Sequence, residues 1–575
     1  MDGTALGVDV GGTFTDVVLV DDGHLTTAKV ATTADQSEGV IDGIERACDR
    51  AGVALSAVDR FRHATTVAVN AMLEGTGAET ALVTTDGFSD VLEIGRQDRP
   101  SLYDLDARKP DPLVPAERRY GVDERATPEG IERAVDPDAV RALADRIDAE
   151  AVAVATLHAY AHSDNERRIA EILRERLDVP VSASHEVLAT FREYERTATT
   201  VADATLAPVV ADYLDRLIER ASDRGLPAPR VMQANGGIAD AETVRERAVT
   251  TVMSGPAAGV VGAAAFAPDD AAGAITFDMG GTSSDVSLVR DGEAERTTEA
   301  DVGGHPIRTP MVDVETVGAG GGSVAWVDDG GALRVGPRSA GADPGPACYG
   351  RGGTEPTVTD AALVLGYLGP ETTLGDDLRL DPAAAEDALA DLAAAADLDG
   401  PVAAARGVYR IANATMTRAI RRVTTERGHD PRGFALVAFG GAGPMHAAGL
   451  AERLGIKRVV VPRASGVLSA FGLLAADEHH DAVRTHRTTL AEADPETVDA
   501  VYEDLRERVL DDASDPTAAT CQRQADCRYA GQSHELTVDV NAPFDPDDVR
   551  ERFHDAHERA RGYRLADEPV ALVNC

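Results

Sequence analysis

The sequence predicts an α/β protein in which one structural unit occurs twice. Residues 9–23 and 278–292 align without a gap, as DVGGTFTDVVLVDDG and DMGGTSSDVSLVRDG, and ten positions are identical. A self-match in one register is typical of an internal duplication. Each copy places apolar segments on both sides of a Gly-Gly turn and then makes a tight Asp-Gly turn. We therefore expect two related α/β lobes, followed by a small α+β unit at the C-terminus.

Each copy is predicted to form three antiparallel strands. The segments around the Gly-Gly turn have strand-like patterns, and Asp22-Gly23 and Asp291-Gly292 lead into the third strand. The expected strands are residues 5–10, 14–20 and 25–30, and residues 274–278, 286–289 and 293–297. Ser37 is the expected N-cap of a helix through residue 50, and Gly52 follows the end of this helix.

Strand and helix patterns alternate along the rest of the chain. Pro180 weakens one expected strand, and Pro208 is expected to kink or split a long helix, because proline lacks the N–H that a helix needs. Residues 303–353 are dense in Gly and Pro, which suits loops that approach a ligand or loops that are flexible. The expected strands are residues 151–157, 179–183 and 434–439; the expected helices are residues 165–177, 197–220, 251–265, 382–398 and 407–428, and residues 494–516 are expected to be a link.

The composition indicates a globular protein of several domains with a large acidic excess. A chain of 575 residues is too long for one hydrophobic core. The formal net charge is −42, and lysine occurs only at positions 29, 109 and 457. This composition is typical of adaptation to high salt, where ions screen the repulsion between acids; an acidic patch for a basic partner is the alternative.

The composition also excludes several classes of function. Nucleic acid binding requires a basic surface, which an acidic chain does not provide. No apolar run is long enough to cross a bilayer, so no membrane contact is expected. The N-terminus shows no secretory signal, so a cytoplasmic location is expected. The five cysteines are scattered and odd in number, which argues against a disulfide framework.

The duplicated loops have the composition of a phosphate and metal site. Glycines let backbone N–H groups turn toward an anion, and a neighbouring hydroxyl adds a donor. A carboxylate beside such a loop can hold Mg²⁺ or its waters. The expected ATP-binding residues are Gly11, Gly12, Thr13, Gly280, Gly281 and Thr282, with Asp9 and Asp278 as catalytic residues and metal ligands. Ordinary hairpin turns are the alternative, although turns alone do not require the acid and the hydroxyl in both copies.

A third glycine-rich loop follows the expected strand at residues 434–439. Residues 439–446 read FGGAGPMH, in which a strand runs into small residues and then into a helix. Such a turn lets a flat adenine ring lie against the backbone; a turn that merely permits close packing is the alternative. The expected adenosine-binding residues are Gly440, Gly441, Ala442 and Gly443.

With three loops in this order, the chain resembles the actin-like ATPase superfamily, in which two ribonuclease-H-like lobes close around ATP. More narrowly, it resembles the hydantoinase A / 5-oxoprolinase family. The motifs that carry this resemblance include RHATTVAVNA at residues 62–71, SGPAAG at 254–259, GAGGGS at 318–323, SAGADPGPACYGRGG at 339–353 and PTVTDA at 356–361. They extend over nearly the whole chain, and the block at residues 339–361 is highly specific.

The resemblance implies three domains. These are an N-terminal ribonuclease-H-like lobe at residues 1–190, a second ATPase lobe at residues 191–490 and a C-terminal domain at residues 491–575. Relatives continue past the segment that resembles residues 569–574, whereas this chain ends at Cys575. The C-terminal domain is therefore expected to be incomplete, or to belong to a short subgroup.

The resemblance also implies the chemistry. Transfer of the γ-phosphoryl group of ATP to an amide oxygen gives an imidate phosphate, which is electrophilic enough for water to open the ring. The implied activity is that of an ATP- and Mg²⁺-dependent hydrolase subunit acting on a small lactam or imide. The substrate would be 5-oxoproline, as in glutathione metabolism, or a hydantoin, and a hydantoinase B-type subunit would complete a hetero-oligomer. The alternatives are the ATP-binding subunit of an acetone/acetophenone-type carboxylase and an ATP-driven reactivase or chaperone-like protein.

The residues that contact the acceptor are expected in the first lobe. His63, close to Thr65, suits a group that polarises or deprotonates the substrate, or else a histidine hydrogen-bonded within the fold. Arg96 and Gln97 suit a substrate carboxylate, because the arginine fork matches its geometry, or else a solvated surface. We expect His63 to be catalytic and Thr65, Arg96 and Gln97 to bind the substrate.

Overall fold

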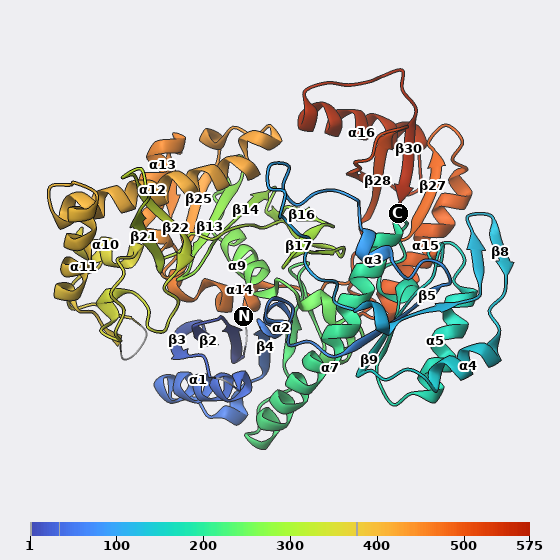
Figure 1. Ribbon diagram of the computed structural model, residues 1–575, viewed down its shortest axis with the longest axis horizontal. Helices are drawn as coiled ribbons and strands as arrows, with labels where there is room; N and C mark the ends of the chain where they lie inside the picture. Colours follow the sequence, from blue (N-terminus) through green and yellow to red (C-terminus); the bar gives the residue numbers. More distant parts are fainter. Residues whose placement is uncertain (1–2, 34, 375–377) are drawn as a thin grey trace.

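The computed structural model describes residues 3–33, 35–374 and 378–575, and its first sheet belongs to the N-terminal copy (Figure 1). The strands of this sheet are β1 (Ala5–Val10), β2 (Phe14–Asp21), β3 (His24–Ala31), β4 (Arg60–Ala64), β11 (Arg230–Met232) and β12 (Ile238–Ala239). Their order is β12-β11-β4-β1-β2-β3. β1, β2 and β3 are antiparallel neighbours, whereas β4 runs parallel to β1 and β11 parallel to β4. The sheet therefore draws on residues on both sides of position 190.

A second sheet repeats this arrangement. Its strands are β13 (Ala274–Met279), β14 (Ser284–Arg290), β15 (Glu293–Ala294), β20 (Glu315–Val317), β25 (Ala435–Phe439) and β26 (Arg458–Val460). β13, β14 and β15 are antiparallel neighbours, and β25 runs parallel to β13 as β4 does to β1. The Asp-Gly turns also agree, since Asp22 and Gly23 have φ of 46° and 77° and Asp291 and Gly292 have 54° and 83°. The predicted duplication is confirmed.

Two local predictions in these copies were wrong. The third strand of the second copy is broken: β15 ends at Ala294, and β16 (Arg296–Thr297) pairs instead with β19 (Met311–Val312). The helix α1 (Gln36–Ala51) is capped by Asp35 rather than Ser37. The Asp35 carboxylate accepts the N–H of Ser37 at 3.1 Å, because Asp35 is the last residue with extended backbone before the helix.

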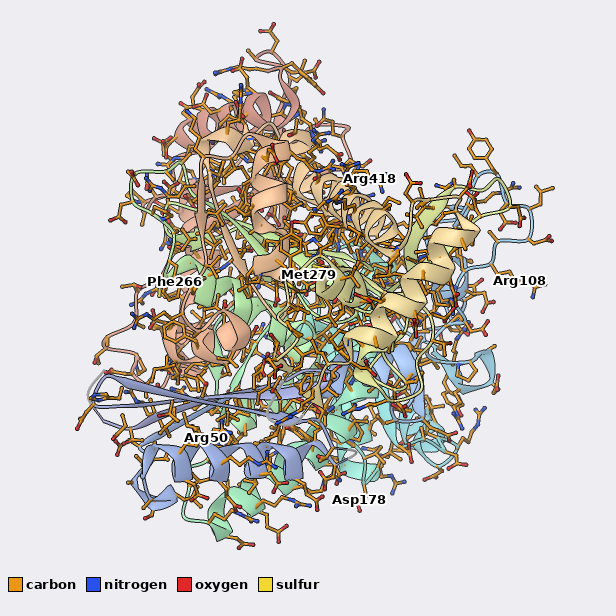
Figure 2. All side chains as sticks on the ribbon, turned by 90° about the vertical axis from the view of Figure 1, so that its left-hand side faces the viewer. Arg50, Arg108, Asp178, Phe266, Met279 and Arg418 are labelled. Carbon is orange, nitrogen blue, oxygen red and sulfur yellow. The ribbon has the colours of Figure 1, made fainter. Side chains whose placement is uncertain are left out.

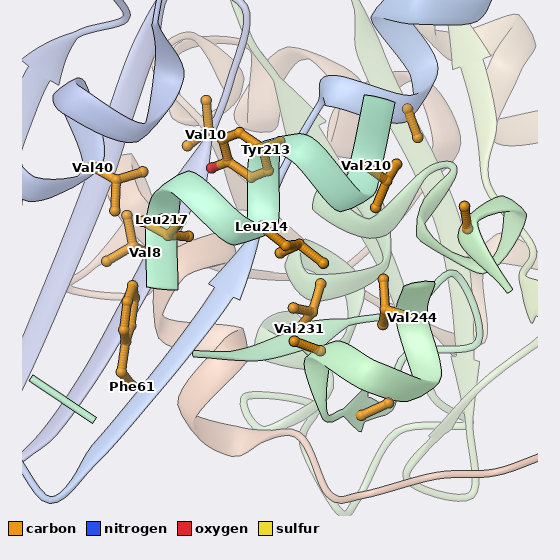
Figure 3. Packing of buried hydrophobic residues seen from close by; sticks show 14 of the residues in the cluster. Val8, Val10, Val40, Phe61, Val210, Tyr213, Leu214, Leu217, Val231 and Val244 are labelled. Atoms are coloured by element: carbon orange, nitrogen blue, oxygen red, sulfur yellow. The ribbon is translucent and has the colours of Figure 1, made fainter. Parts of the chain in front are cut away.

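The long helix α7 (Glu193–Asp223) joins two parts of the core. Pro208 lies inside this helix and does not split it. Figure 3 shows Tyr213, Leu214 and Leu217 of α7 packed against strand residues that include Val8 and Phe61. Burial of this apolar face outweighs the loss of one helical hydrogen bond at the proline.

The N-terminal half of α7 covers a separate parallel sheet. Its strands are β5 (Thr80–Thr85), β6 (Arg119–Val122), β9 (Ala151–Ala155) and β10 (Val181–Ala183), in the order β10-β9-β5-β6. Val152 and Val154 of β9 pack in the core that includes α5 (Asp164–Arg176), and the alanines of β9 pack on α7. Strands covered on both faces explain the continuous apolar runs in this part of the sequence.

Two short helices lie between the two lobes. They are α9 (Ser254–Ala264) and α14 (Leu468–Ala475), which pack on each other, with α14 against β1 and α9 against β13 (Figure 1). A Cβ added at Gly472 would lie 1.9 Å from the carbonyl oxygen of Ala258 and 2.7 Å from the backbone nitrogen of Gly262. Glycine at this crossing therefore sets how closely the lobes approach.

The C-terminal unit is a four-stranded antiparallel sheet with two helices. Its elements are β27 (Thr485–Thr489), β28 (Arg523–Tyr529), β29 (Leu536–Val540), β30 (Val570–Asn574), α15 (Pro495–Asp511) and α16 (Pro546–Arg561). The strand order is β27-β30-β28-β29. Val498, Tyr502 and Leu505 of α15 are buried in this unit, so the segment predicted to be a link is instead a core helix.

The remaining elements cover these sheets or form hairpins. They are the helices α2 (Val67–Glu74), α3 (Val91–Ile94), α4 (Pro137–Ala144), α6 (Ser184–Val187), α8 (Ala241–Glu246), α10 (Val358–Val364), α11 (Pro382–Ala395), α12 (Pro401–Val423) and α13 (Gly443–Leu454), and the hairpins β7–β8 (Arg125–Thr127, Gly130–Arg133), β17–β18 (Ala300–Val302, His305–Ile307), β21–β22 (Ser323–Val327, Leu333–Ser339) and β23–β24 (Thr373–Leu374, Leu378–Arg379). None of the helices in the described ranges combines the length and apolarity that a membrane crossing needs.

Candidate functional site

The two Gly-Gly loops have the same backbone geometry. The N–H of Gly11 donates to the carbonyl of Phe14 at 2.9 Å, and the N–H of Gly280 donates to the carbonyl of Ser283 at 3.0 Å. Met279, at the start of the second loop, lies in the middle of the molecule, whereas Arg50, Arg108 and Asp178 lie at its edges (Figure 2). The duplicated loops thus form equivalent turns, and Gly281 and Thr282 of the second loop are exposed.

The loops bring Asp9 and Asp278 within electrostatic reach of each other. Both residues are half-buried, so a ligand can reach carboxylates that are largely removed from bulk water. Burial and the charge of Asp16 raise the pKa of Asp9 to about 7. Burial, Asp285 and then Asp9 raise the pKa of Asp278 to about 8. Asp9 Oδ1 is buried without a hydrogen-bond partner in the described part of the protein.

Each acid faces a glycine at the start of a helix. A Cβ at Gly255, in the first turn of α9, would lie 3.3 Å from Asp9 Oδ1. A Cβ at Gly440, in the third loop, would lie 2.1 Å from Asp278 Oδ1, and Gly440 has φ of 80°. A side chain at Gly440 would displace the acid, so the third loop and the second phosphate loop are built as one unit.

The third loop is hydrogen-bonded to the second. The N–H of Ala442 donates to the carbonyl of Met279 at 2.9 Å, and the N–H of Gly440 donates to the carbonyl of Ser465 at 2.8 Å. Gly443 begins α13 and is buried. All four residues predicted to contact adenosine therefore lie in one turn beside Asp278.

Each of the three loops has a glycine that faces open space. Added Cβ atoms at Gly12, Gly281 and Gly441 would meet no protein atom within 4 Å. The side chain of Thr13 is half-buried and that of Thr282 is exposed beside them. The protein itself does not need glycine for packing at these three positions, so the space beside them is open to solvent or to a ligand.

The Gly-rich segment braces the second loop, which sequence reasoning did not predict. The N–H groups of Gly321 and Gly322 donate to the carbonyls of Gly280 and Gly281 at 3.0 and 2.7 Å. A Cβ at Gly320 would lie 2.6 Å from the carbonyl carbon of Gly281. The Gly- and Pro-rich composition was expected to give loops that approach a ligand or loops that are flexible. Here the backbone does approach closely, but it approaches the second Gly-Gly loop.

Lys29 is a further site residue that sequence reasoning missed. Its Nζ pairs with the carboxylate of Asp16 and lies 5.1 Å from the ring centre of Phe14. Its charge lowers the pKa of Asp9 against the larger effect of burial. The equivalent acid of the second copy, Asp285, instead accepts the hydroxyl of Thr316 at 2.6 Å. The sequence did contain a signal for Lys29. The chain has only three lysines, and this one lies in a strand beside the first loop.

His63 lies inside the fold. It is completely buried, its Nδ1 is 3.1 Å from the carbonyl of Val8, and its Nε2 is 2.7 Å from the hydroxyl of Tyr213. Burial lowers its pKa to about 4, so the ring is neutral near pH 7. Because both ring nitrogens are engaged within the protein, this geometry favours the alternative of a histidine hydrogen-bonded within the fold, and a catalytic role for His63 stays a prediction.

The three predicted substrate residues do not gather at one point. Arg96 is exposed, and its Nε donates to Glu195 Oε1 on α7 at 2.7 Å. Gln97 is exposed in the same loop, with φ of 56°. Thr65 is buried at the end of β4, where its hydroxyl accepts the N–H of Val67 at 3.2 Å. Of these three, Thr65 directly follows β4, whose last residue, Ala64, pairs with Asp9.

The pair of acids has the chemistry of a magnesium site completed by phosphates. Within the described residues, no group of three or more metal-ligating side chains is present. Mg²⁺ is commonly held by one or two carboxylates, with waters and substrate phosphates completing its shell. Asp9 with its unpartnered oxygen and Asp278 with its raised pKa fit this pattern, since a cation relieves the cost of ionising both.

Comparison with known proteins gives matches along most of the chain. The model of the hydantoinase/oxoprolinase N-terminal region matches residues 5–177, and that of hydantoinase/oxoprolinase matches residues 196–482. The chain is similar to the crystal structure of the ATP-dependent caprolactamase from Pseudomonas jessenii. The TM-score is 0.89 at 37% identity, over 99% of this chain and 86% of that chain.

Three named relatives differ in what they act on. Caprolactamase subunit alpha of Pseudomonas jessenii is 39% identical, over 99% of this chain and 86% of the relative. Acetophenone carboxylase gamma subunit of Aromatoleum aromaticum is 35% identical, over 92% and 77%. 5-Oxoprolinase of Saccharomyces cerevisiae is 32% identical over 99% of this chain, which spans only 48% of that protein.

Proposed function

The chain belongs to the hydantoinase/oxoprolinase family, and we propose that it activates a cyclic amide by phosphorylating the carbonyl oxygen with ATP. The acceptor is 5-oxoproline or a hydantoin, and a B-type subunit completes ring opening in a hetero-oligomer. The observation that carries this proposal is that Asp9 and Asp278 lie within electrostatic reach of each other, beside three loops that each have a glycine facing open space. That two relatives are named as subunits supports the hetero-oligomer.

In this proposal, different residues bind the different parts of ATP. The backbone of the two Gly-Gly loops binds the phosphates, and residues 440–443 hold the adenosine. Asp9 and Asp278 would hold Mg²⁺, which would supply positive charge to offset the negative charge on the transferring phosphoryl group. The amide oxygen attacks the γ-phosphorus, the bond to the β–γ bridging oxygen breaks, and ADP leaves. Water then attacks the carbon of the imidate phosphate, the ring C–N bond breaks with a proton going to the nitrogen, and an acyl phosphate remains. A second water attacks the acyl carbon, the bond from this carbon to the phosphate oxygen breaks, and phosphate departs with the original carbonyl oxygen.

Measurement of ADP release tests this function. The purified chain, with and without a B-type partner, is supplied with Mg²⁺, ATP and either 5-oxoproline or a hydantoin. We expect ADP release to rise with the cyclic amide and ring-opened product to appear when the partner is present. If no lactam, imide or ketone raises ADP release above the rate with ATP alone, the proposal is wrong.

Similarity to acetophenone carboxylase gamma subunit favours one second candidate. A ketone can lose an α-proton and accept the phosphoryl group as its enol phosphate. Bicarbonate then attacks the phosphorus, which releases the enolate and carboxyphosphate; the carboxyphosphate splits into phosphate and carbon dioxide, and the enolate carbon adds to the carbon dioxide. This alternative predicts ADP release that requires a ketone and product formation that requires bicarbonate. Turnover of a cyclic amide without bicarbonate would exclude it.

A further inference from the structure

A polar cavity lies between the first lobe and the C-terminal unit, outside the three loops. It has a volume of about 50 Å³, which is roughly the space of three or four water molecules or of one small oxyanion. Segments that are far apart in the sequence line it, and their residues include Arg247, Thr309, Asp481 and Arg508. The cavity therefore belongs to the contact between these two parts of the molecule.

Two arginines cross this contact in opposite directions. Arg508 lies in α15, and its Nη2 donates to the carbonyl of Glu186 in α6 at 2.7 Å. Arg247 follows α8, and its Nη2 donates to Asp512, at the end of α15, at 2.5 Å. Each arginine thus uses one of its three nitrogens to connect α15 with the first lobe.

Both arginines keep donors that a ligand can reach. Nε and Nη1 of Arg508 and of Arg247 have no hydrogen-bond partner among the described residues, and none of these atoms is fully buried. The hydroxyl of Thr309 is likewise without a partner in the described part of the protein and is not fully buried. The residues around the cavity therefore offer several N–H groups and one O–H group to an acceptor.

The acids that line the cavity already have partners. Among the described residues these acids are Asp481 and Glu186. The carboxylate of Asp481 accepts from Asn235 Nδ2 at 2.7 Å, and that of Glu186 is paired with Arg174 Nη2 at 2.5 Å. Neither carboxylate forms an ion pair with Arg508 within the described structure. The acids of the cavity therefore do not cancel the charge of Arg508.

The positive charge of Arg508 is poorly compensated. Burial and the neighbouring Arg247 lower the pKa of Arg508 below its usual range. An anion between the two guanidinium groups would reduce both effects, because it attracts both charges and replaces part of the lost hydration. This local excess of positive charge occurs in a chain whose net charge is −42. The cavity thus suits an anion rather than a cation.

We propose that this cavity binds a small oxyanion, either phosphate or a carboxylate, between Arg247 and Arg508. The planar forks of the two guanidinium groups match the oxygen atoms of such an anion, and the Thr309 hydroxyl adds a third donor. The bound anion would connect α15 with the first lobe through both arginines. This inference goes beyond the proposed function, since it concerns a ligand site outside the three loops and does not depend on ATP.

Calorimetric titration of the full chain tests the proposal. The probes are inorganic phosphate and acetate, each added at an ionic strength that KCl keeps constant. Mg²⁺ and a saturating non-hydrolysable ATP analogue are present, so that phosphate does not enter the three loops. Arg508→Gln removes the charge and keeps a donor for the Glu186 carbonyl. We expect the wild type to bind at least one probe, and Arg508→Gln to bind it roughly 10- to 100-fold more weakly.

Two further variants make the result specific. Thr309→Val removes the hydroxyl at similar volume, so it should weaken binding of the same probe by roughly 2- to 10-fold. Arg506→Gln removes an exposed arginine of the same helix, paired with Glu503 at 2.8 Å, and should bind as the wild type does. A bound anion also stabilises the folded state, so the probe should raise the melting temperature of Arg506→Gln by more than that of Arg508→Gln. Similar melting temperatures without the probe show that the variants are folded.

The outcomes also separate this site from the three loops. Failure of the wild type to bind either probe, or equal binding by Arg508→Gln and Arg506→Gln, overturns the proposal. Phosphate binding that survives in Arg508→Gln but is lost in Asp278→Asn would assign the anion to the loops and overturn it as well. Tighter binding of phosphate identifies a phosphate site, and tighter binding of acetate identifies a carboxylate site; both support the proposal. None of these measurements requires turnover, so a lack of ADP release would contradict the proposed function and leave the anion site standing.

Discussion

The raised pKa values of Asp9 and Asp278 determine how the site responds to pH. Without a cation, the folded protein holds protons on these acids up to pH values of about 7 and 8, whereas ordinary aspartates ionise near 3.8. Between these limits the folded state binds more protons than the unfolded state. The free energy of unfolding therefore falls as pH rises from about 4 to 8, by the linkage between proton binding and stability. A bound cation replaces the protons, so cation affinity should rise over the upper part of this range.

Replacement of one acid separates folding from activity. Asp278→Asn removes the cost of ionisation, so we expect the metal-free variant to melt at a higher temperature than wild type, by a margin that grows from pH 5 to pH 8. The same variant should lose ATP turnover by about 100-fold or more, because a ligand of the charge-stabilising cation is gone. Thermal melts across pH and steady-state ADP release are the measurements.

The control for this variant lies in the same hairpin. Asp291→Asn makes the same chemical change in a turn that tolerates asparagine at positive φ. It should change neither the slope of stability with pH nor the turnover. Near-normal turnover in Asp278→Asn would show that this carboxylate does not hold the cation.

His63 is expected to contribute to stability and not to the chemical step. His63→Phe leaves the Tyr213 hydroxyl and the Val8 carbonyl without their partner, which should cost about 1–3 kcal/mol in the free energy of unfolding. Tyr213→Phe breaks one of the same hydrogen bonds from the other end and serves as the matched variant. Denaturant melts and kcat are measured for both. A loss of kcat in folded His63→Phe that Tyr213→Phe does not show would restore a catalytic role.

At the scale of elements, the glycines of the third loop differ in what they do. Gly440→Ala places a methyl group against Asp278 at positive φ, which should cost about 1–3 kcal/mol in backbone strain alone and reduce turnover. Gly441→Ala meets no protein atom within 4 Å, so it should leave the melting temperature near that of wild type while raising the KM for ATP. Equal melting temperatures for the two variants would contradict the packing described for this loop.

The elements show what the sequence could predict and what it could not. Patterns within a few residues predicted the three loops and the strands of both copies apart from the third strand of the second copy, because turn chemistry and alternation are local. The cap of α1 was wrong, since Asp35 and Ser37 are both good caps and only the backbone distinguishes them. The bracing of the second loop by residues 318–322 depends on contacts between distant segments, which a single sequence does not contain.

The same limit applied to the site residues. The burial of His63 and the pairing of Lys29 with Asp16 could not be predicted, because packing between distant segments decides them: Tyr213, 150 residues away, contacts the His63 ring.

At the scale of the whole molecule, the net charge of −42 predicts a strong dependence on salt. Added KCl shortens the Debye length from about 10 Å at 0.1 M to about 3 Å at 1 M, which screens repulsion between surface acids. We expect the melting temperature to rise steadily over this range. Sucrose at matched water activity is the control, because it does not screen charge. A melting temperature that stays constant or falls with KCl would contradict adaptation to salt.

The arrangement of the lobes gives the central claim its physical basis. Two copies of one loop meet at Asp9 and Asp278 because α9 and α14 pack closely between the sheets, and the third loop joins the second. The claim that follows is that this meeting point transfers a phosphoryl group to a carbonyl oxygen. The fate of that oxygen tests the claim without reference to any single residue.

The most direct measurement uses 5-oxoproline labelled with ¹⁸O in its ring carbonyl, turned over by the chain with its B-type partner, Mg²⁺ and ATP. Mass spectrometry of the released inorganic phosphate then reports where the oxygen went. The account predicts one ¹⁸O atom per phosphate formed in coupled turnover. Phosphate that carries no label, while ring-opened product accumulates, would show that ATP hydrolysis does not proceed through the carbonyl oxygen and would contradict the account.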